Sequence, residues 1–215
     1  LSRPGGGHEI EASRLLPLGV QEQTGLANIS VNARESLAMK LRHDLRTIAS
    51  QFQIYGEFCG AEPYGSGHIN DTYCVVFNQA GKMTRYILQR INHAVFKNPI
   101  ALMENIQRVT DHLAAKMAGQ PDCSRRVLSL IPARNNVCYH ADDEGNIWRA
   151  YFFIEQARSY DAVENPGQAF EAARAYGHFL KLLADLPAPR LHDTIPDFHH
   201  TTKRFATLVK AIEKD

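Results

Sequence analysis

Apolar residues recur at steps of three and four in several stretches of the chain, a spacing typical of helices with one buried face. The most regular stripe lies between residues 102 and 117 and predicts a helix there. Asn98 can cap this helix, Pro99 suits its first turn, and Gly119 follows its last apolar position. The same spacing predicts three further helices: from Arg34 to about Gln53, from Asn165 to Leu183, and from about Thr201 to Ile212.

Shorter runs rich in β-branched and aromatic residues, separated by glycine-containing turns, predict strands. Their ranges are Ile54–Pro63, Asn70–Asn78, Met83–Asn92, Arg126–Pro132 and Trp148–Glu155. The chain therefore reads as three strands, one long helix, two strands and then helices only. This order predicts an α+β protein with a five-stranded antiparallel sheet, one helix in the first lobe and a helical second lobe.

The change in character along the chain predicts three parts. Residues 1–33 contain three consecutive glycines and no sustained period, and we expect a mobile leader there. Residues 34–157 form the strand-rich lobe and its exit, and residues 158–215 begin the helical lobe. The chain starts at Leu1 and stops among charged residues, so we expect both ends to be cut and the second lobe to be incomplete.

Composition places the chain among ordinary globular proteins, with 44% hydrophobic and 22% charged residues. A net charge of +1 gives no basis for non-specific binding to nucleic acid or membrane surfaces. The longest apolar run, from Ala150 to Ile154, is far shorter than the ~20 residues of a membrane-spanning helix. The four cysteines include no Cys-x-x-Cys pair, which disfavours zinc and predicts free thiols in a reducing cytoplasm. His192, His199 and His200 fit a solvated loop better than a metal site.

The strongest candidate for chemistry is the turn at Tyr64–Asn70, which lies between two predicted strands. Its glycines let the backbone approach a ligand closely and direct amide donors at anionic oxygens. Gly65, Ser66, Gly67 and His68 are therefore candidate phosphate-binding residues, and a plain hairpin turn is the alternative. No Gly-Lys-Ser/Thr string and no helix follow directly, which excludes a Walker loop and a Rossmann turn.

Five strings, at residues 65–73, 86–92, 96–105, 151–155 and 194–199, occur in the same order as in a known family. On these strings the chain resembles the N-acetylhexosamine 1-kinases, which belong to the aminoglycoside-phosphotransferase-like superfamily of small-molecule kinases. The order of elements around the glycine turn also resembles the nucleotide-binding lobe of the protein-kinase-like two-lobe fold. The resemblance covers about Tyr55 to Lys210.

This resemblance implies a cytoplasmic enzyme of carbohydrate metabolism that transfers the γ-phosphate of ATP, with Mg2+, to the anomeric hydroxyl of an N-acetylhexosamine. Its partner would be a small-molecule sugar, with neither nucleic acid nor membrane involved, and the oligomeric state is not predicted. A kinase for another hydroxyl substrate, such as an aminoglycoside, choline or homoserine, stays open as an alternative. A non-catalytic nucleotide-binding pseudokinase module is the alternative from a different class.

Phosphoryl transfer needs a cation on the phosphates, which the protein-kinase-like fold carries on its third strand. Arg90 is the candidate by charge, and Gln89 is the alternative, because strand alternation lets only one of the two face the nucleotide. Glu104, on the following helix, is the candidate partner of Arg90. The alternative is a neutral pair of Gln89 and Asn105, in which Glu104 is a solvated acid near the helix start.

The exit from the last predicted strand is expected to form the hinge between the lobes. Glu155, Gln156 and Ala157 would offer backbone groups to the adenine base, the alternative being a buried strand that simply ends there. We expect the base to pack against Val75 and against Ile87 or Leu88.

No residue of the chain is a candidate for the catalytic Asp. The string His140–Asp142 resembles a catalytic His-x-Asp triplet, but Ile147 stands where an Asn should follow. Residues 142–146 are instead typical of a hairpin turn. Asp161 could meet ribose or cap the next turn. We expect the catalytic and metal-binding residues to follow Asp215, so that residues 1–215 alone show no turnover.

Overall fold

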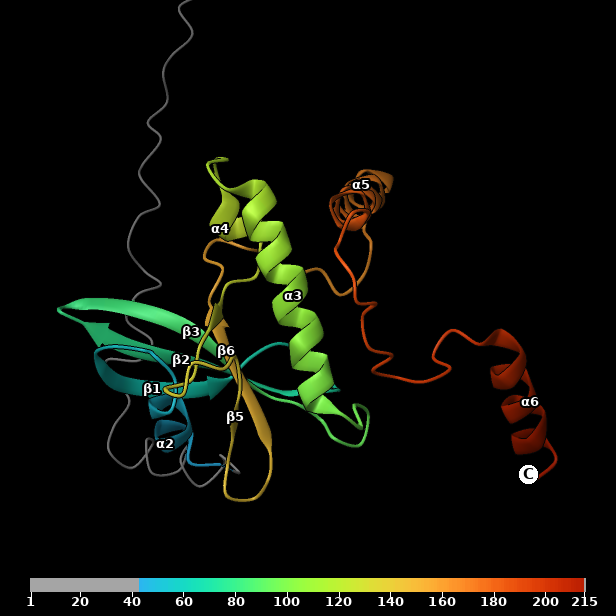
Figure 1. Cartoon of the computed structure of the whole chain (residues 1–215), viewed down its shortest axis with the longest axis horizontal. Helices are drawn as coiled ribbons and strands as arrows, with labels where there is room; N and C mark the ends of the chain where they lie inside the picture. The colour runs from blue at the N-terminus through green and yellow to red at the C-terminus, as the bar shows by residue number, and fades with distance from the viewer. Residues whose placement is uncertain (1–42, 215) are drawn as a thin grey trace, which may run out of the picture. The chain divides into compact units, whose positions relative to one another are not determined.

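The structure is a computed structural model that describes residues 43–214 of the chain (Figure 1). The predicted leader at residues 1–33, and residues 34–42 of the first predicted helix, lie outside this range. Within it, all strands lie between residues 57 and 152 and only helices follow, which confirms the predicted α+β order.

Six strands of the described chain form one antiparallel sheet, so the predicted number of five is wrong. Their order across the sheet is β1–β2–β3–β6–β4, and β5 also pairs with β6. The additional strand, β5, has two residues, too few to produce an alternating pattern in the sequence. The strands are β1 (Glu57–Pro63), β2 (Asp71–Gln79), β3 (Lys82–Arg90), β4 (Leu130–Ile131), β5 (His140–Ala141) and β6 (Ile147–Phe152).

The helices of the described chain are α2 (Leu45–Ser50), α3 (Pro99–Met117), α4 (Cys123–Arg126), α5 (Pro166–Leu183) and α6 (Thr201–Ile212). The predicted cap at Asn98 is confirmed, because its side chain accepts from the Ala101 amide at 3.0 Å. The predicted helix start at Asn165 is also confirmed, and its side chain caps α5 by accepting from the Gln168 amide at 3.0 Å. None of these helices is both long enough and apolar enough to cross a membrane.

The helix predicted across residues 34–53 is wrong at Asp44, which starts a helix instead of continuing one. The Asp44 side chain accepts a hydrogen bond from the Thr47 amide at 3.1 Å and caps α2. The helix ends at Ser50, because Phe52 pairs with Ala133 in an isolated β-bridge. Phe52 is apolar at helical spacing, but its fully buried ring packs in the core from an extended backbone.

The strand predicted at Arg126–Pro132 is also shorter than expected. The one-turn helix α4 ends at Arg126, and only Leu130 and Ile131 join the sheet. Val127 explains the difference, because it is buried in a cluster with Leu113 and Met117 of α3. Its apolar character therefore serves helix packing instead of a strand.

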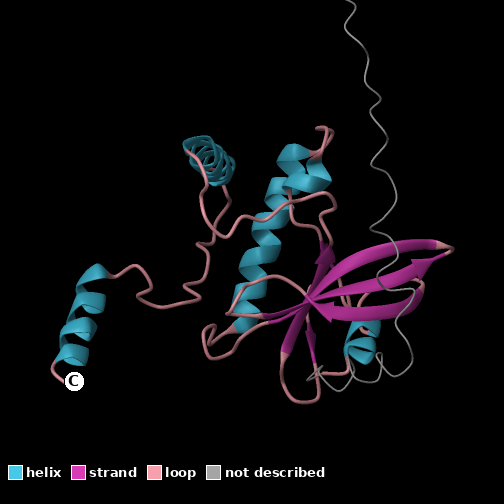
Figure 2. Ribbon diagram, turned by 180° about the vertical axis from the view of Figure 1, so that it is seen from behind, coloured by secondary structure: helices cyan, strands magenta, loops and turns pink. Residues whose placement is uncertain are grey.

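The two faces of the sheet pack against different segments (Figure 2). One face carries Trp148, whose ring is fully buried and lies edge-to-face with His43, 5.0 Å between ring centroids, just before α2. The opposite face carries Ile147, which is buried with Met103 of α3. Because Trp148 and Ile147 are neighbours on β6, strand alternation separates the α2 side from the α3 side.

A row of polar residues on α3 binds the segment at residues 182–193, which includes the end of α5 and the loop that follows it. Glu104, Arg108, His112 and Lys116 follow one another at steps of four and therefore share one side of the helix. Arg108 donates to two prolyl carbonyls at 2.7 and 2.6 Å, and both His112 and Lys116 bond the carboxylate of one aspartate. This side of α3 is thus occupied by chain from beyond the sheet.

We predict that Gly56→Ala destabilises the fold because Gly56, with φ +102°, tolerates no side chain. An added Cβ would lie 2.4 Å from the Asn78 carbonyl oxygen, and the backbone angle itself disfavours L-residues. We expect the free energy of unfolding to fall by about 2 kcal/mol, measured by urea denaturation. Gly60→Ala is the matched control, because nothing lies within 4 Å of its added Cβ. Equal unfolding midpoints for the two variants would contradict this prediction.

Candidate functional site

The glycine turn leaves β1 and enters β2 with its tip free of internal backbone bonds. The Tyr64 amide donates to the Thr72 carbonyl at 2.9 Å and closes the base of the turn. Beyond it, the amides of residues 65–68 have no acceptor among residues 43–214, and all four residues are exposed. Gly65 has φ +85°, a left-handed conformation that glycine adopts without strain. The turn therefore presents unused amide donors, as phosphate binding requires.

The far side of the turn is tied to the end of β3. The Asn92 side chain donates to the Ile69 carbonyl at 2.9 Å, and the Asn92 amide donates to the Asn70 side chain at 3.0 Å. These bonds hold the turn at both of its ends, while the amides of residues 65–68 keep no acceptor among residues 43–214. The sequence strings that carry Asn70 and Asn92 are thus explained by one structural contact.

The tip of the turn meets the segment that follows β6. Ser66 Oγ donates to Asp161 Oδ1 at 3.0 Å, and the Tyr64 ring lies edge-to-face with Phe153, 5.3 Å between centroids. Asp161 thus contacts the glycine turn, a contact that neither of its two expected roles included. The turn and the strand exit therefore border the same region of the molecule.

The register of β2, β3 and β6 decides which candidate side chains share a face of the sheet. Thr72 lies opposite Gln89, and Gln89 lies opposite Arg149, so these three form one row across the strands. Tyr64 extends this row, since it pairs with Thr72 at the base of the turn. Arg90, the next residue after Gln89, points to the other face.

Arg90 is engaged on that other face. Its Nε and Nη2 both donate to Asp71 Oδ2, at 2.8 and 2.6 Å, and its Nη1 donates to the Asn146 side chain at 3.1 Å. Arg90 therefore ties the start of β2 and the hairpin before β6 to the end of β3. The predicted ion pair of Arg90 with Glu104 is wrong, because strand alternation directs Arg90 away from α3.

Glu104 instead pairs with the segment that covers the polar side of α3. Its Oε2 lies 2.7 Å from His192 Nε2, while Asn105 exchanges two hydrogen bonds of 2.9 Å with the His192 backbone. The alternative pair of Gln89 with Asn105 is therefore not formed either. Met103 is the α3 residue in this turn that points into the core, so residues 104 and 105 point elsewhere.

The cation beside Gln89 is Arg149, which the sequence reasoning missed. Its Nε and Nη2 donate to Gln89 Oε1 at 2.9 and 2.5 Å, and Gln89 Nε2 donates onward to Thr72 Oγ1 at 2.6 Å. Burial lowers the pKa of Arg149, but an arginine side chain stays protonated in proteins, so the guanidinium is charged. A basic residue inside a run of buried strand residues was the signal that could have identified it.

The predicted hinge is a turn held by two arginines. Arg85 pairs with the Glu155 carboxylate, and these hydrogen bonds raise the pKa of Arg85. Arg125 donates to the carbonyls of Glu155 and Gln156, and Gln156 has a left-handed φ of +55°. The role of Glu155, Gln156 and Ala157 toward adenine stays a prediction.

The apolar residues expected around adenine are divided between the two faces. Val75 and Leu88 are 0% exposed and share the face of Trp148, so neither presents surface to a ligand. Ile87, 4% exposed, lies on the face of the Gln89 row, opposite Cys74 of β2. Burial raises the pKa of the Cys74 thiol to about 11, which keeps it protonated near neutral pH.

Asp142 organises the hairpin before β6, as predicted, and not a catalytic loop. Its carboxylate accepts from the Trp148 indole at 2.8 Å, from the Glu144 amide at 3.0 Å, and from both the amide and the side chain of Asn146 at 2.8 and 3.0 Å. Burial opposes the charged form, but these hydrogen bonds outweigh it and lower the pKa of Asp142.

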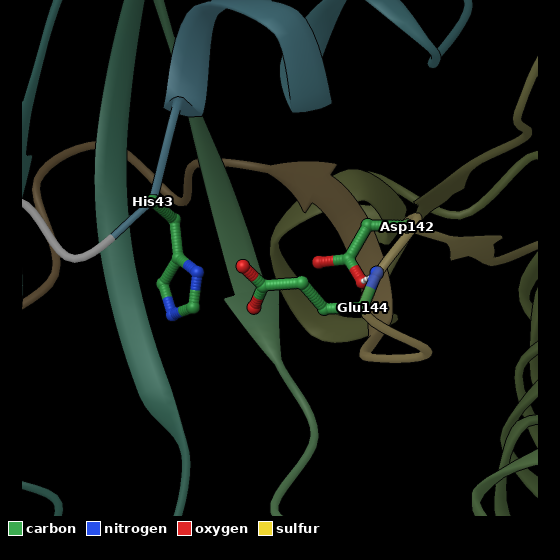
Figure 3. Close-up of side chains that lie close together, drawn as sticks. All are labelled: His43, Asp142 and Glu144. Carbon is green, nitrogen blue, oxygen red and sulfur yellow. Dashed lines mark hydrogen bonds between the residues drawn. The ribbon is translucent and has the colours of Figure 1, made fainter.

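His43, Asp142 and Glu144 bring potential metal-ligand atoms within 4.8 Å of one another (Figure 3). They are the one such group of three in the described part of the chain, and the predicted histidine loop forms none. The Asp142 oxygens already accept four hydrogen bonds within the hairpin. His43 packs on Trp148, on the face away from Gln89, so this group is separate from the glycine-turn face.

Comparison with known families identifies a family to which the sequence is similar. The sequence model of the phosphotransferase enzyme family matches residues 60–214. The match begins in β1, includes the glycine turn and the whole Thr72–Gln89–Arg149 row, and extends beyond the end of α6. It therefore covers most of the chain.

We predict that Asp142→Asn lowers the free energy of unfolding by about 1–2 kcal/mol at pH 7, because an amide cannot accept all four hydrogen bonds. Since the pKa of Asp142 is lowered on folding, the carboxylate stabilises the fold above its unfolded value near 3.8. This stabilisation is lost as the pH falls through the lower pKa that Asp142 has in the folded protein. Asp143→Asn is the control: its side chain is exposed and has no hydrogen-bond partner among residues 43–214. Urea denaturation at pH 7 and pH 3 tests this, and an unchanged stability difference at pH 3 would contradict it.

Proposed function

The chain belongs to the phosphotransferase enzyme family, and from this premise we propose that it is an ATP-dependent kinase that phosphorylates a small-molecule hydroxyl, that of an N-acetylhexosamine. Family membership supports a phosphotransferase that acts as a small-molecule kinase. The nucleotide, the metal ion and the sugar are the proposed part.

The open glycine turn is the observation that carries the proposal. Four successive exposed residues, 65–68, have amides without acceptors in the described chain, and both ends of the turn are anchored. An anchored turn loses little further entropy when its amides bind phosphate oxygens, which favours binding. At Gly67 a ligand can approach the backbone closely, because the residue has no side chain and nothing lies within 4 Å of the position that a Cβ would take.

The glycine turn and the segment that follows β6 lie close enough together for one nucleotide to contact both. Tyr64 and Phe153 lie on the face of Gln89, and both rings keep some exposed surface. We propose that the base lies near these rings, beside the turn at Glu155–Ala157, with the phosphates toward the glycine turn. We also keep the boundary at residue 157 as the proposed division between a nucleotide-binding lobe and a helical lobe.

Mg2+ is proposed as the ion that accompanies ATP. It usually binds through one or two carboxylates together with substrate phosphates and water. Among the described residues, Asp161 is the one whose carboxylate contacts the glycine turn, and it already accepts a hydrogen bond from the Ser66 hydroxyl. This does not make a metal site, and we assign no step to the ion and no described residue to the proton-accepting role.

The sugar acceptor rests on the sequence resemblance. The string at residues 194–199 lies directly before α6, outside the sheet, where substrate contacts separate from the nucleotide face are expected. Transfer to a hydroxyl requires the acceptor and the γ-phosphate to be held within about 3–3.5 Å in line. Residues of the helical segment are the proposed source of that positioning.

We predict that Gly67→Val weakens ATP binding at least about tenfold, because a branched side chain would keep the phosphates from the turn amides. The fold should be unaffected, since the position is open and its backbone angle is not left-handed. Gly177→Val is the matched control, with equally open surroundings on α5. Isothermal titration calorimetry checks the affinities, and equal ATP affinity in Gly67→Val and the control would exclude the turn as the phosphate site.

Phosphorylation of an N-acetylhexosamine is the direct test of the acceptor. The protein expressed from its complete reading frame should transfer phosphate from ATP to the anomeric hydroxyl of N-acetylglucosamine or N-acetylgalactosamine, detected as a sugar 1-phosphate by 31P NMR. Aminoglycosides, choline and homoserine form the comparison panel. Transfer to one of these and not to the sugars would overturn the sugar assignment, while ATP binding without any transfer would favour the nucleotide-binding module.

A further inference from the structure

Arg149 carries a positive charge that no acidic group of the described chain offsets. No carboxylate among residues 43–214 lies within ion-pair distance of it, and its one hydrogen-bond partner, Gln89, is neutral. Arg90 is the contrast, because it is also partly buried but bonds Asp71 through two of its nitrogens. Partial burial of a guanidinium without an acidic partner is unfavourable, which makes the position a candidate for binding an anion.

Within the described chain, hydrogen bonds fix the orientation of the Arg149 side chain and leave one of its nitrogens free to bind an anion. Gln89 accepts from both Nε and one Nη of Arg149, and Gln89 is itself fixed by donating to Thr72. The second Nη of Arg149 has no acceptor in the described chain, and the residue keeps part of its surface exposed. A guanidinium so oriented suits the oxygens of a phosphate, to which it donates parallel hydrogen bonds.

The row that contains Arg149 leads to the glycine turn. Thr72 is the second residue of β2 and pairs with Tyr64 at the base of the turn, and neighbouring strands lie about 4.8 Å apart. Arg149 is therefore two strands, about 10 Å, from Thr72 along one face. A phosphate chain bound at the turn amides can extend along this face toward the guanidinium.

We propose that Arg149, on β6, supplies the cation that binds the phosphates of the nucleotide, in place of a basic residue on β3, and that Gln89 is its positioning residue. This inference rests on the proposed nucleotide-binding function. It assigns Arg90 to holding strands together and gives the β3 position facing the nucleotide to a neutral amide. The bound group is recognised as the di- or triphosphate tail, so the base alone gains nothing from Arg149.

The test compares ADP with adenosine in the full chain, by calorimetry at fixed ionic strength with EDTA present. Arg149→Gln should lower ADP affinity about tenfold or more and change adenosine affinity less than about twofold. Arg149→Lys should retain part of the ADP affinity, because it keeps the charge but not the paired donors. An unchanged ratio of ADP to adenosine affinity in Arg149→Gln would overturn the inference and leave the proposed function standing.

Gln89→Glu gives a second, independent readout. A carboxylate at this position would pair with Arg149, so the variant should unfold at a higher urea concentration than the wild-type protein while binding ADP at least about tenfold more weakly. Gln89→Leu, which removes the positioning bonds without adding charge, should weaken ADP binding without that gain in stability. Unchanged ADP affinity in Gln89→Glu would show that Arg149 does not meet the phosphates, and a wild-type chain that binds neither ligand would overturn the proposed function itself.

Discussion

The antiparallel register of β2, β3 and β6 is the constraint on which the rest of the site depends. Because side chains alternate, a shift of one residue would exchange the contents of the two faces. In the observed register, Thr72, Gln89 and Arg149 share one face with Tyr64 of the glycine turn. Arg90 lies on the other face, where it bonds Asp71 of β2 and Asn146 of the hairpin before β6. This register places Arg149 and Arg90 on opposite faces of the sheet: Arg90 is bound to Asp71, and Arg149 is the cation that we propose for the phosphates.

The polar side of α3 is the second constraint, because it fixes what that helix cannot do. Glu104 and Asn105 are bound to His192, and Arg108 and Lys116 bind neighbouring parts of the segment at 182–193. The apolar side of the helix packs under the sheet near β6. The helix therefore links the sheet to the chain beyond it and contributes no acidic partner to either β3 candidate. A neutral Gln89 beside a half-buried Arg149 is consistent with that lack of an acid.

Much of the fold could be predicted because its signals are local. The Asn98 cap, the helix start at Asn165, the glycine turns and the long apolar stripe of α3 each act within a few residues, and the structure confirms them. The predictions that were wrong concern features that depend on tertiary contacts. Val127 has the character of a strand residue but packs on α3, and the two residues of β5 are too few to form a pattern. The glycine turn could be identified from sequence, whereas Arg149 could not be paired with Gln89 without knowing that β6 lies beside β3.

We propose that nucleotide phosphates bind on the face of the sheet that carries Gln89 and Arg149. The most direct measurement is the structure of the complete protein with ADP bound. We expect a phosphate oxygen within about 3 Å of the Arg149 guanidinium, with the glycine-turn amides on the same phosphate chain. A phosphate chain bound against Arg90, on the face of Trp148, would contradict it.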